Sequence, residues 1–447
     1  MSTAEWLRAI NRFGLPEGWR LASVGSRYDV QLGKMLNAER AAEPRSSGAA
    51  PYLRNVNVQW GRIDTNDLKW MHFSAEDRAK YALRRGDLLV CEGGEIGRCA
   101  IWDSDREGCF FQKALMRVRS RGPDSLDWLA LCVRALADGG ALSAGADKST
   151  IDHLPAEKLR ALRIPLPGHE GQREILRALD AEIWRIDALI AQRRRQAQLL
   201  VSRRSSLMFA AVCGTLGPQS ACRPSGVAWL STLPENWSEL KLTRVARLGS
   251  GHTPSRSHPE WWVDCTIPWI TTGEVAQIRD DRREVLYETR ENISVIGLGN
   301  SAAELRPAGT VVLSRTASAG YSALMGTEMA TSQDFVTWTC SDRLLPRFLL
   351  FCLRAMRPDL LGRLAMGSTH RTIYFPDVES IRIPLPPVVE QQRMLDLADE
   401  QLAALGPLEA AIDRQIELLC ERRHALITAA VTGKLQVSKR IAANAAA

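Results

Sequence analysis

Several features that would reveal the class of a protein directly are missing from this chain of 447 residues. No run of about 18 apolar residues is present, so we expect no transmembrane helix. Charges at Glu5, Arg8, Arg12 and Glu17 interrupt the first twenty residues, so we expect no signal-peptide core. The ten cysteines form no C-x-x-C pair, and no Cys/His cluster has zinc-ligand spacing. These absences predict a cytoplasmic protein with reduced thiols and no metal site.

Motifs for catalysis are missing as well. The chain has no P-loop, no Gly-rich methyl-donor loop after a strand, and no Pro-Pro-[Tyr/Phe] motif of amino-methyltransferases. No helical pattern follows the Gly-rich run Gly93–Gly97, so we interpret it as a turn. A nuclease-like acidic-x-Lys pattern at Glu239–Lys241 has no Pro-Asp upstream, and we interpret it as surface. The sequence therefore predicts binding and not catalysis.

The composition is that of an ordinary globular protein, with 45% hydrophobic and 24% charged residues. At roughly 100–200 residues per domain, the length predicts two to four domains. The formal net charge of +7 favours a polyanionic partner only mildly, because many basic proteins bind nothing anionic.

What the chain does contain is a long internal repeat. Four motifs occur twice in the same order, at offsets close to 219 residues. They are L-P-E-x-W at 15–19 and 233–237, G-x-x-[KH]-x-T-I at 145–151 and 367–373, I-P-L-P at 164–167 and 383–386, and A-A-V-x-G-x-L at 210–216 and 429–435. This period is far too long for a solenoid, so it indicates one duplicated unit of about 220 residues with pseudo-two-fold symmetry.

Each copy begins with a strand-rich part. Residues 52–58 alternate between apolar and polar side chains, and short apolar runs at 86–91 and 309–313 follow turn residues. Helical patterns occur at 126–136 and 346–356. We therefore predict a mixed α/β fold with two strand-rich domains.

Each I-P-L-P motif is followed by a long helical pattern that ends at a glycine, Gly214 or Gly433. About 40 residues at about 1.5 Å each would span ~60 Å, and the apolar stripe is narrow, which is typical of a coiled-coil seam. The seam residues, which would also help to dock partner subunits, are predicted to be Ile183, Ile190, Leu200, Leu207, Leu402, Ile412, Leu419 and Leu426.

The charges of the two helices favour pairing with each other. Residues 168–216 carry eight arginines against five acidic residues, and residues 387–435 carry five basic against eight acidic residues. Two-fold symmetry would make this pair antiparallel. The alternative, in which each helix lies on its own globular domain, stays open. Gly406-Pro407 should kink or interrupt the second helix.

The predicted organisation has five segments. They are an N-terminal segment with the first strand-rich domain (1–167), the first long helix (168–216), a linker with the second strand-rich domain (217–386), the second long helix (387–436) and a flexible tail (437–447).

Two variable strand-rich domains, each followed by a helix ending in A-A-V-x-G-x-L, resemble the specificity (S) subunit of type I restriction–modification enzymes. Further stretches that carry this resemblance are Pro51–Val58, Gly61–Asp64, Gly251–Ser255, Trp261-Trp262, Ile267–Glu274 and Glu390–Arg393. The first copy departs from the last of these, reading Glu170-Gly171-Gln172-Arg173, and Gly406-Pro407 is a second departure. The resemblance covers almost the whole chain.

The resemblance implies that each strand-rich domain is a target-recognition domain that reads one half of a bipartite sequence in double-stranded DNA. The paired helices would hold these domains at a fixed distance and dock two modification (methyltransferase) subunits, which motor–nuclease restriction subunits then join. The chain itself would be non-catalytic and bind no cofactor. S-adenosylmethionine, ATP and magnesium would belong to the partners, and the complex would act in phage defence.

Reading DNA requires polar side chains for base edges, and cations or backbone N–H groups for phosphates. In the first domain the candidates are Arg54, Asn55 and Asn57, for which a solvated strand face is the alternative. Lys148 and Ser149 lie in a Gly-led loop that could hold a phosphate or could be a tight turn.

In the second domain the candidates lie in comparable loops, with the same structural alternatives. They are Thr253, Ser255, Arg256, Thr271, Thr272, Arg315, His370 and Arg371.

Two other functions stay open from the residues alone. A scaffold that binds proteins through two domains would show no steep salt dependence in DNA binding. A stand-alone enzyme that both recognises and methylates DNA would need the methyltransferase motifs that are missing here.

Overall fold

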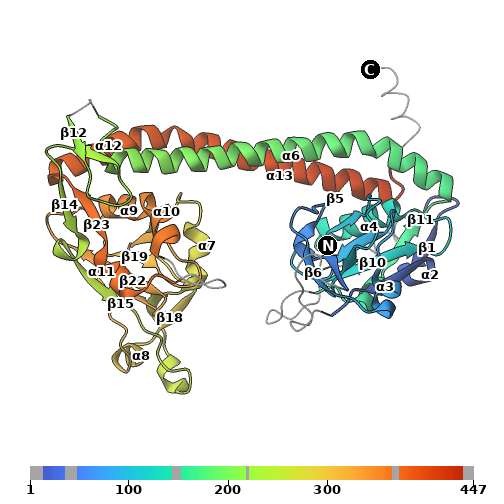
Figure 1. The fold of residues 1–447 in the computed structure, drawn as a ribbon, viewed down its shortest axis with the longest axis horizontal. Coiled ribbons are helices and arrows are strands. Elements are labelled where there is room, and N and C mark those ends of the chain that lie inside the picture. Colours follow the sequence, from blue (N-terminus) through green and yellow to red (C-terminus); the bar gives the residue numbers. More distant parts are fainter. Residues whose placement is uncertain (1–13, 36–47, 143–152, 218–220, 365–371, 436–447) are drawn as a thin grey trace. The chain divides into compact units, whose positions relative to one another are not determined.

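The structure, a computed structural model, describes residues 14–35, 48–142, 153–217, 221–364 and 372–435. The predicted tail at 437–447 lies outside these ranges. The chain divides into two compact units, which we describe separately. Unit 1 contains residues 1–192 and 416–447, and unit 2 contains residues 193–415. Each unit therefore holds one strand-rich part together with portions of both long helices (Figure 1).

Unit 1 is built around a four-stranded sheet of order β2-β10-β7-β8, with a smaller sheet of order β6-β3-β9 beside it. Its elements are β1 (Arg20–Ser23), α2 (Val24–Arg27), β2 (Tyr28–Leu32), β3 (Ala49–Leu53), η2 (Asn55–Asn57), β4 (Val58–Gln59), β5 (Arg62–Ile63), β6 (Lys69–His72), α3 (Ala75–Tyr81), β7 (Leu88–Cys91), β8 (Cys99–Ile101), β9 (Phe110–Phe111), β10 (Leu115–Ser120), α4 (Leu126–Asp138), α5 (Ala156–Ala161) and β11 (Arg163–Leu166).

Unit 2 repeats this plan with a five-stranded sheet of order β15-β22-β19-β20-β17 and a small sheet of order β18-β16-β21. Its elements are β12 (Cys222–Pro224), β13 (Thr232–Pro234), β14 (Ser238–Lys241), η3 (Leu242–Arg244), β15 (Ala246–Ser250), η4 (Pro259–Trp262), β16 (Ile267–Ile270), η5 (Thr272–Glu274), α7 (Val275–Ile278), β17 (Val285–Leu286), β18 (Glu291–Ile293), α8 (Val295–Gly299), β19 (Val311–Ser314), β20 (Ser322–Met325), β21 (Ala330–Thr331), β22 (Phe335–Cys340), α9 (Pro346–Ala355), α10 (Arg357–Asp359), η6 (Leu360–Leu364), α11 (Phe375–Ser380) and β23 (Arg382–Leu385).

Strand register shows that the repeat extends to individual residues. The first I-P-L-P motif lies in β11 and pairs antiparallel with β1, so that Ser23 faces Arg163. The second lies in β23 and pairs with β14, so that Lys241 faces Arg382. The helices predicted near 126–136 and 346–356 are confirmed as α4 and α9, each packed on its main sheet. A mixed α/β fold built from two related domains is therefore confirmed.

One predicted strand is wrong in part. The alternating segment 52–58 stays extended only as far as Leu53, and residues 55–57 form a turn of 3-10 helix. The Asn57 side chain causes the break, because its Oδ1 accepts the N–H of Arg54 at 2.8 Å and its Nδ2 donates to Asp64 O at 3.1 Å. An asparagine that bonds nearby backbone groups competes with a strand ladder.

The long helices are α6 (His169–Val212), α12 (Val388–Ala403) and α13 (Leu405–Val431). Within unit 1, Ile175 and Leu179 of α6 share a core with Ile427 and Val431 of α13. Ion pairs further along α6 reach earlier residues of α13, so the two helices run in opposite directions there.

Within unit 2, Leu207 and Ala211 of α6 share a core with Leu395 and Ala398 of α12. The second helical segment is interrupted at Ala404, two residues before Gly406-Pro407. Pro407 then lies in the first turn of α13, where a missing N–H costs no helical hydrogen bond.

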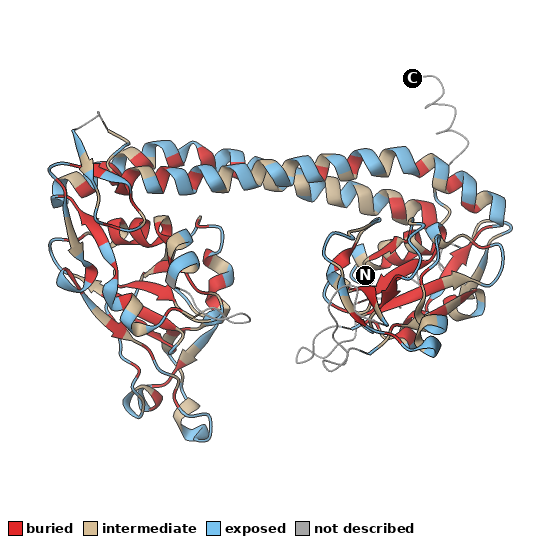
Figure 2. Cartoon of the chain, viewed as in Figure 1, coloured by how far each residue is buried: buried red, intermediate tan, exposed pale blue. Residues whose placement is uncertain are grey.

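Buried residues lie along the strands of the sheets and in α4 and α9 (Figure 2). Two buried glutamines anchor these helices to the start of the long ones. Gln172 accepts the N–H of Ser125 at 2.8 Å and donates to Pro167 O, and Gln391 accepts the N–H of Leu345 at 2.8 Å and donates to Pro386 O. Gln172 thus holds the start of α4, and Gln391 the start of α9, against the strand that carries the I-P-L-P motif.

Candidate nucleic-acid interface

In unit 1 the candidate Asn55 contacts the Gly-rich segment Gly93–Gly97, which forms a turn between β7 and β8, as predicted. The Asn55 amide donates to Gly93 O at 2.6 Å, and its Oδ1 accepts a hydrogen bond from Arg98 at 2.8 Å. Trp60 Nε1 donates to Glu95 at 2.5 Å. The turn therefore displays backbone groups beside one amide and one guanidinium, which is chemistry suited to base edges and phosphates.

The side chains of Arg54 and Asn57 bind neighbouring residues of unit 1. Asn57 is 3% exposed and closes the turn described above. Arg54 Nη2 donates to Asp67 Oδ2 at 2.6 Å, and this hydrogen bond, with that of Lys69, lowers the pKa of Asp67. Contact between Arg54 and DNA would require this exposed ion pair to open, which costs little at a surface.

In unit 2 three loops meet at the equivalent end of the main sheet. Thr253 Oγ1 donates to Gln333 Oε1 at 2.5 Å, and Arg315 Nε donates to Gln333 O at 2.9 Å. The structure thus brings two predicted residues together through Gln333, which sequence reasoning missed. The Arg315 guanidinium also lies over the ring of Phe375, 5.1 Å from its centroid.

The two sets of loops are equivalent. Glu92 follows β7 and its carbonyl accepts the N–H of Leu154 at 2.7 Å, whereas Arg315 follows β19 and its carbonyl accepts the N–H of Ile373 at 2.8 Å. The turn Gly93–Gly97 is therefore the unit 1 counterpart of the loop that starts at Arg315. The predicted residues Lys148, Ser149, His370 and Arg371 belong to the segments before Leu154 and Ile373, and they lie outside the described residues.

The remaining candidates of unit 2 lie around η4 and η5. The Ser255 hydroxyl shares a hydrogen bond of 2.7 Å with Ser257. Arg256 lies 3.7 Å from the ring centroid of Trp262 and pairs with Glu291 at 2.8 Å. Thr271 and exposed Thr272 begin the turn that leads to buried Glu274. These residues do not join the Thr253–Gln333–Arg315 group through any hydrogen bond between described residues.

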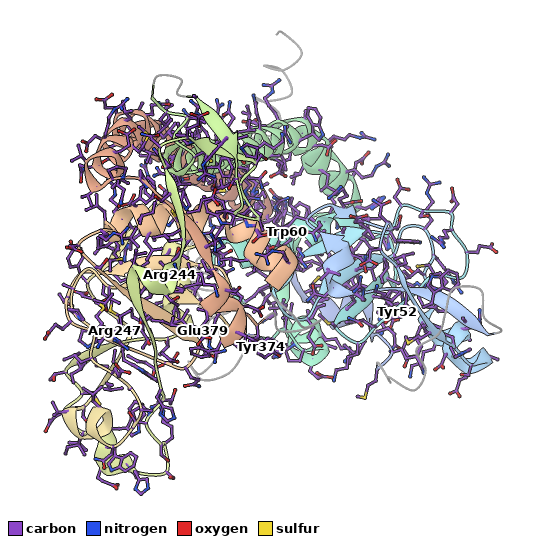
Figure 3. The ribbon with its side chains drawn as sticks, turned by 60° about the vertical axis from the view of Figure 1, so that its left-hand side comes forward. Tyr52, Trp60, Arg244, Arg247, Tyr374 and Glu379 are labelled. Atoms are coloured by element: carbon purple, nitrogen blue, oxygen red, sulfur yellow. The ribbon has the colours of Figure 1, made fainter. Side chains whose placement is uncertain are left out.

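A row of exposed cations in unit 2 was also missed. Lys241, Arg244 and Arg247 follow one another along β14, η3 and β15, and none of them makes an ion pair with a described carboxylate. Lys241 lines an open cleft of about 480 Å³ together with Phe375 and Glu379. Figure 3 labels Arg244, Arg247 and Glu379 in this unit, with Tyr374 near them. We call Lys241, Arg244 and Arg247 the 241–247 row; the K-x-x-R-x-x-R spacing is its sequence signal.

The predicted seam residues differ in how deeply they are buried. Ile190, Leu207 and Leu402 are buried. Ile183 is partly buried against the core of unit 1, and Leu200 against that of unit 2. Partial exposure remains at Ile412, Leu419 and Leu426. Ile427, the residue after Leu426, is fully buried instead.

The acidic pattern at 239–241 has a structural role, which corrects its interpretation as surface. Glu239 Oε1 accepts from Arg223 at 3.0 Å, and Oε2 accepts the N–H of Gly226 at 3.0 Å.

Burial raises the pKa of the Cys91 and Cys109 thiols to about 11, so both remain protonated and unreactive at neutral pH. Among the described residues, no His/Cys/Asp/Glu group could hold a metal ion and no helix is long and apolar enough to cross a membrane.

Comparison with known families identifies the repeat. The type I restriction modification DNA specificity domain matches twice, at residues 16–198 and 234–418. The chain belongs to this family. Each match covers one strand-rich part and continues into a long helix, so the family's domain coincides with the internal repeat.

Relatives and solved structures agree with this membership. The chain is 24% identical over 440 residues to the type I restriction enzyme StySPI specificity subunit of Salmonella potsdam, covering 96% of this chain and 92% of that one. It is 26% identical over 168 residues to the MjaIX specificity subunit of Methanocaldococcus jannaschii, which is 37% of this chain and 38% of that relative. A solved chain from work on complex assembly and conformational transition of the type I R-M system has a TM-score of 0.55, with 18% identity over 94% of this chain and all of that one. This likeness supports the fold.

One departure from the specificity-family pattern is smaller than the sequence suggests. When the two sequences are aligned letter by letter, E-G-Q-R at 170–173 matches E-Q-Q-R at 390–393 with Gly171 in place of Gln391. In the structure, however, Gln172 and Gln391 make the equivalent hydrogen bonds, each to the proline five residues earlier. The glutamine that anchors the helix is therefore kept in both copies, and Gly171 replaces a residue without that task.

Proposed function

We propose that this chain is the DNA sequence-recognition subunit of a type I restriction–modification complex and reads a bipartite target with its two units. The observation that carries the proposal is the double match of the DNA specificity domain, once per unit, on a chain of two related folds. The units differ in sequence, so the two half-sites should differ as well.

The contacts of the described residues support separate roles in reading bases and in binding phosphates. The loop groups at Gly93–Gly97 and at Arg315–Gln333 carry amide and guanidinium groups that suit base edges. The 241–247 row carries cations that make no ion pair with a described carboxylate and suit phosphates, which fix register without reading sequence. We also propose phosphate contacts for Lys148, Ser149, His370 and Arg371, which lie outside the described residues.

The long helices would act as the spacer. An antiparallel coiled coil with pseudo-two-fold symmetry would relate the two units and set the distance between half-sites, and it would dock two modification subunits and, through them, restriction subunits. The opposite charges of the two helices support this pairing. The partners would use S-adenosylmethionine, ATP and magnesium, whereas this chain would be non-catalytic and act in the cytoplasm in phage defence.

A domain exchange tests the proposal. Replacing residues 20–160 with the corresponding domain of a relative should change one half of the methylated sequence and leave the other half and the spacer unchanged. The readout is methylome sequencing of cells that carry the chimera and its modification subunit. A chimera that changed both halves at once would show that the two units read DNA jointly, and independent recognition would be wrong.

A further inference from the structure

A cleft of about 540 Å³ opens in unit 1 between α4, the first part of α6 and the turn between β4 and β5. Its walls include the apolar side chains of Trp60, Leu176 and Ile183, and two carboxylates, Asp127 and Asp180. Trp60 is one of the residues labelled in Figure 3. The combination of an apolar wall and acidic residues distinguishes this cleft from the basic surface of the 241–247 row.

The two carboxylates, Asp127 and Asp180, are both exposed to solvent. Neither Asp127 nor Asp180 makes an ion pair with a described residue, whereas Asp103, the third acid of the lining, pairs with Arg85 at 2.7 Å. Partial loss of solvent, followed by the negative charge of Asp180, raises the pKa of Asp127. Both acids line the same cleft, so a cation bound there would be attracted by two negative charges.

The cations of the lining do not relieve this repulsion. Arg134 is committed to Asp187 at 3.1 Å and lies 5.3 Å from the ring centroid of Trp60. Arg177 is exposed, one turn before Asp180 on α6, and makes no ion pair with a described residue.

Unit 2 shows how the same place looks when a cation is present. Counting from the anchoring glutamines Gln172 and Gln391, Asp399 takes the place of Asp180, and Arg347 takes the place of Asp127. The Arg347 guanidinium binds Asp399 through two hydrogen bonds of 2.5 and 2.6 Å, and its Nε donates to Glu284 at 2.5 Å. At this place in unit 2, an arginine of the unit itself therefore pairs with both carboxylates.

We propose that the unit 1 cleft accepts an arginine or lysine side chain from a partner protein subunit, held between Asp127 and Asp180. The apolar neighbours of that side chain would pack on Trp60 and Ile183, and on Trp184, which is 74% exposed one turn beyond Asp180. Carboxylates in the lining repel phosphates, so DNA is not the occupant. The inference rests on the proposed function, because it assigns one docking contact of the assembly to unit 1 alone.

Charge variants test the contact on the full chain with the purified modification subunit as the probe. Asp127→Asn combined with Asp180→Asn should weaken binding by roughly tenfold, and Asp127→Arg should weaken it at least as much, because it supplies the cation from within. Glu174→Gln removes an exposed carboxylate of the same helix outside the cleft and should stay within about twofold. Titration calorimetry at low and high salt gives the affinities, and melting curves show that each variant folds.

A crosslink identifies the occupant. p-Benzoylphenylalanine at position 184 should crosslink, in the assembled complex, to a peptide of the modification subunit that contains arginine or lysine. A crosslink to residues 1–13 of this chain, or to a second copy, would overturn the inference. Normal assembly that neither charge variant changes would overturn it as well and leave the proposed function intact. A wild-type chain that binds neither DNA nor the modification subunit would overturn both.

Discussion

Units 1 and 2 share a sheet frame but attach it to the long helices in different ways. In unit 2, arginines of α9 reach acids of neighbouring segments: Arg347 binds Asp399 and Glu284, and Arg354 binds Asp281. In unit 1, the equivalent helix α4 places Asp127 where Arg347 would be, and its ion pairs with described residues of the long helices are Arg134 with Asp187 of α6 and Asp138 with Arg423 of α13. The copies thus keep the apolar and glutamine-based part of the joint and differ in its charged part.

The difference between the two joints shows which interactions stay the same in both copies of a duplicated unit. Hydrogen bonds to backbone groups, such as those of Gln172 and Gln391, work in any copy that keeps the strand and helix geometry. Ion pairs require two side chains to change together, so they diverge between copies. At this joint, unit 2 pairs Asp399 with its own Arg347, whereas Asp127 and Asp180 of unit 1 make no ion pair with a described residue.

The largest effect should come from breaking the charged joint of unit 2. Arg354 is 4% exposed, and it donates to Asp281 O at 2.8 Å and to Arg283 O at 2.7 Å. Arg354→Ala removes the donor of these two carbonyls and one of the two arginines that pair with Asp281, and we expect a loss of about 3–5 kcal/mol in the free energy of unfolding.

The equivalent change in unit 1, Arg134→Ala, is the matched control and should cost about 1 kcal/mol, because its ion pair is nearer to solvent. Urea denaturation measures both losses, and hydrogen exchange of peptides from α4 and α9 assigns each loss to its unit. Equal losses for the two variants would contradict the comparison.

The second expected effect concerns DNA. By strand register, Lys241 and Arg247 of the 241–247 row correspond to Ser23 and Asp29 in unit 1, so only unit 2 has these cations. Changing all three residues of the row to glutamine should weaken binding to duplex DNA by roughly thirtyfold, and reduce the salt slope by up to about 3.

The control for this experiment replaces three exposed arginines of unit 1, Arg62, Arg84 and Arg106, with glutamine. Gel shifts or fluorescence anisotropy at several salt concentrations compare the two triple variants. If both lost the same affinity and slope, the row would have no special role and only net charge would matter.

A third prediction tests what the two copies share. Gln172→Leu and Gln391→Leu each remove a buried amide of similar size and leave backbone partners unsatisfied. Each variant should lose about 2 kcal/mol in the free energy of unfolding, by nearly the same amount. Denaturation of the two variants in parallel measures this, and losses that differ by more than about 1 kcal/mol would mean that the anchors are not equivalent.

Sequence reasoning recovered the parts of the fold that rest on repetition and periodicity. The repeated L-P-E-x-W and I-P-L-P motifs indicated the duplicated unit, and amphipathic spacing located α4 and α9. The break after Leu53 was missed because a side chain causes it: Asn57 bonds to backbone groups that a strand ladder would otherwise use.

The candidate site was harder to predict, because its parts come from loops whose lengths differ between copies. The turn after Cys91 and the loop after Ser314 are equivalent at an offset of 223 rather than 219, so their correspondence appears only in the hydrogen bonds of Leu154 and Ile373. Gln333 meets Thr253 and Arg315 only after the chain folds. Spacing alone cannot indicate such convergence.

The smallest expected effect is on the unfolding free energy, where two equivalent aspartates should respond with opposite signs. Asp180 and Asp399 are equivalent carboxylates, but only Asp399 binds an arginine, Arg347. Asp399→Asn should therefore cost about 1 kcal/mol of unfolding free energy at pH 7, since the pair is partly exposed. Asp180→Asn should cost nothing or stabilise the isolated chain slightly, because it removes a charge that raises the pKa of Asp127.

The pH dependence follows from the same pKa shift. A carboxyl whose pKa is raised in the folded state destabilises it as pH rises from the unfolded pKa through the folded one, and this penalty is absent at lower pH, where the carboxyl is protonated in both states. Asp180→Asn should thus match the wild type near pH 3 and gain a few tenths of a kcal/mol at pH 7, a small value because Asp127 is accessible to solvent. Thermal melts of both variants from pH 3 to pH 7 measure this. A loss at pH 7 for Asp180→Asn as large as that for Asp399→Asn would show that unit 1 already holds a cation between its two acids.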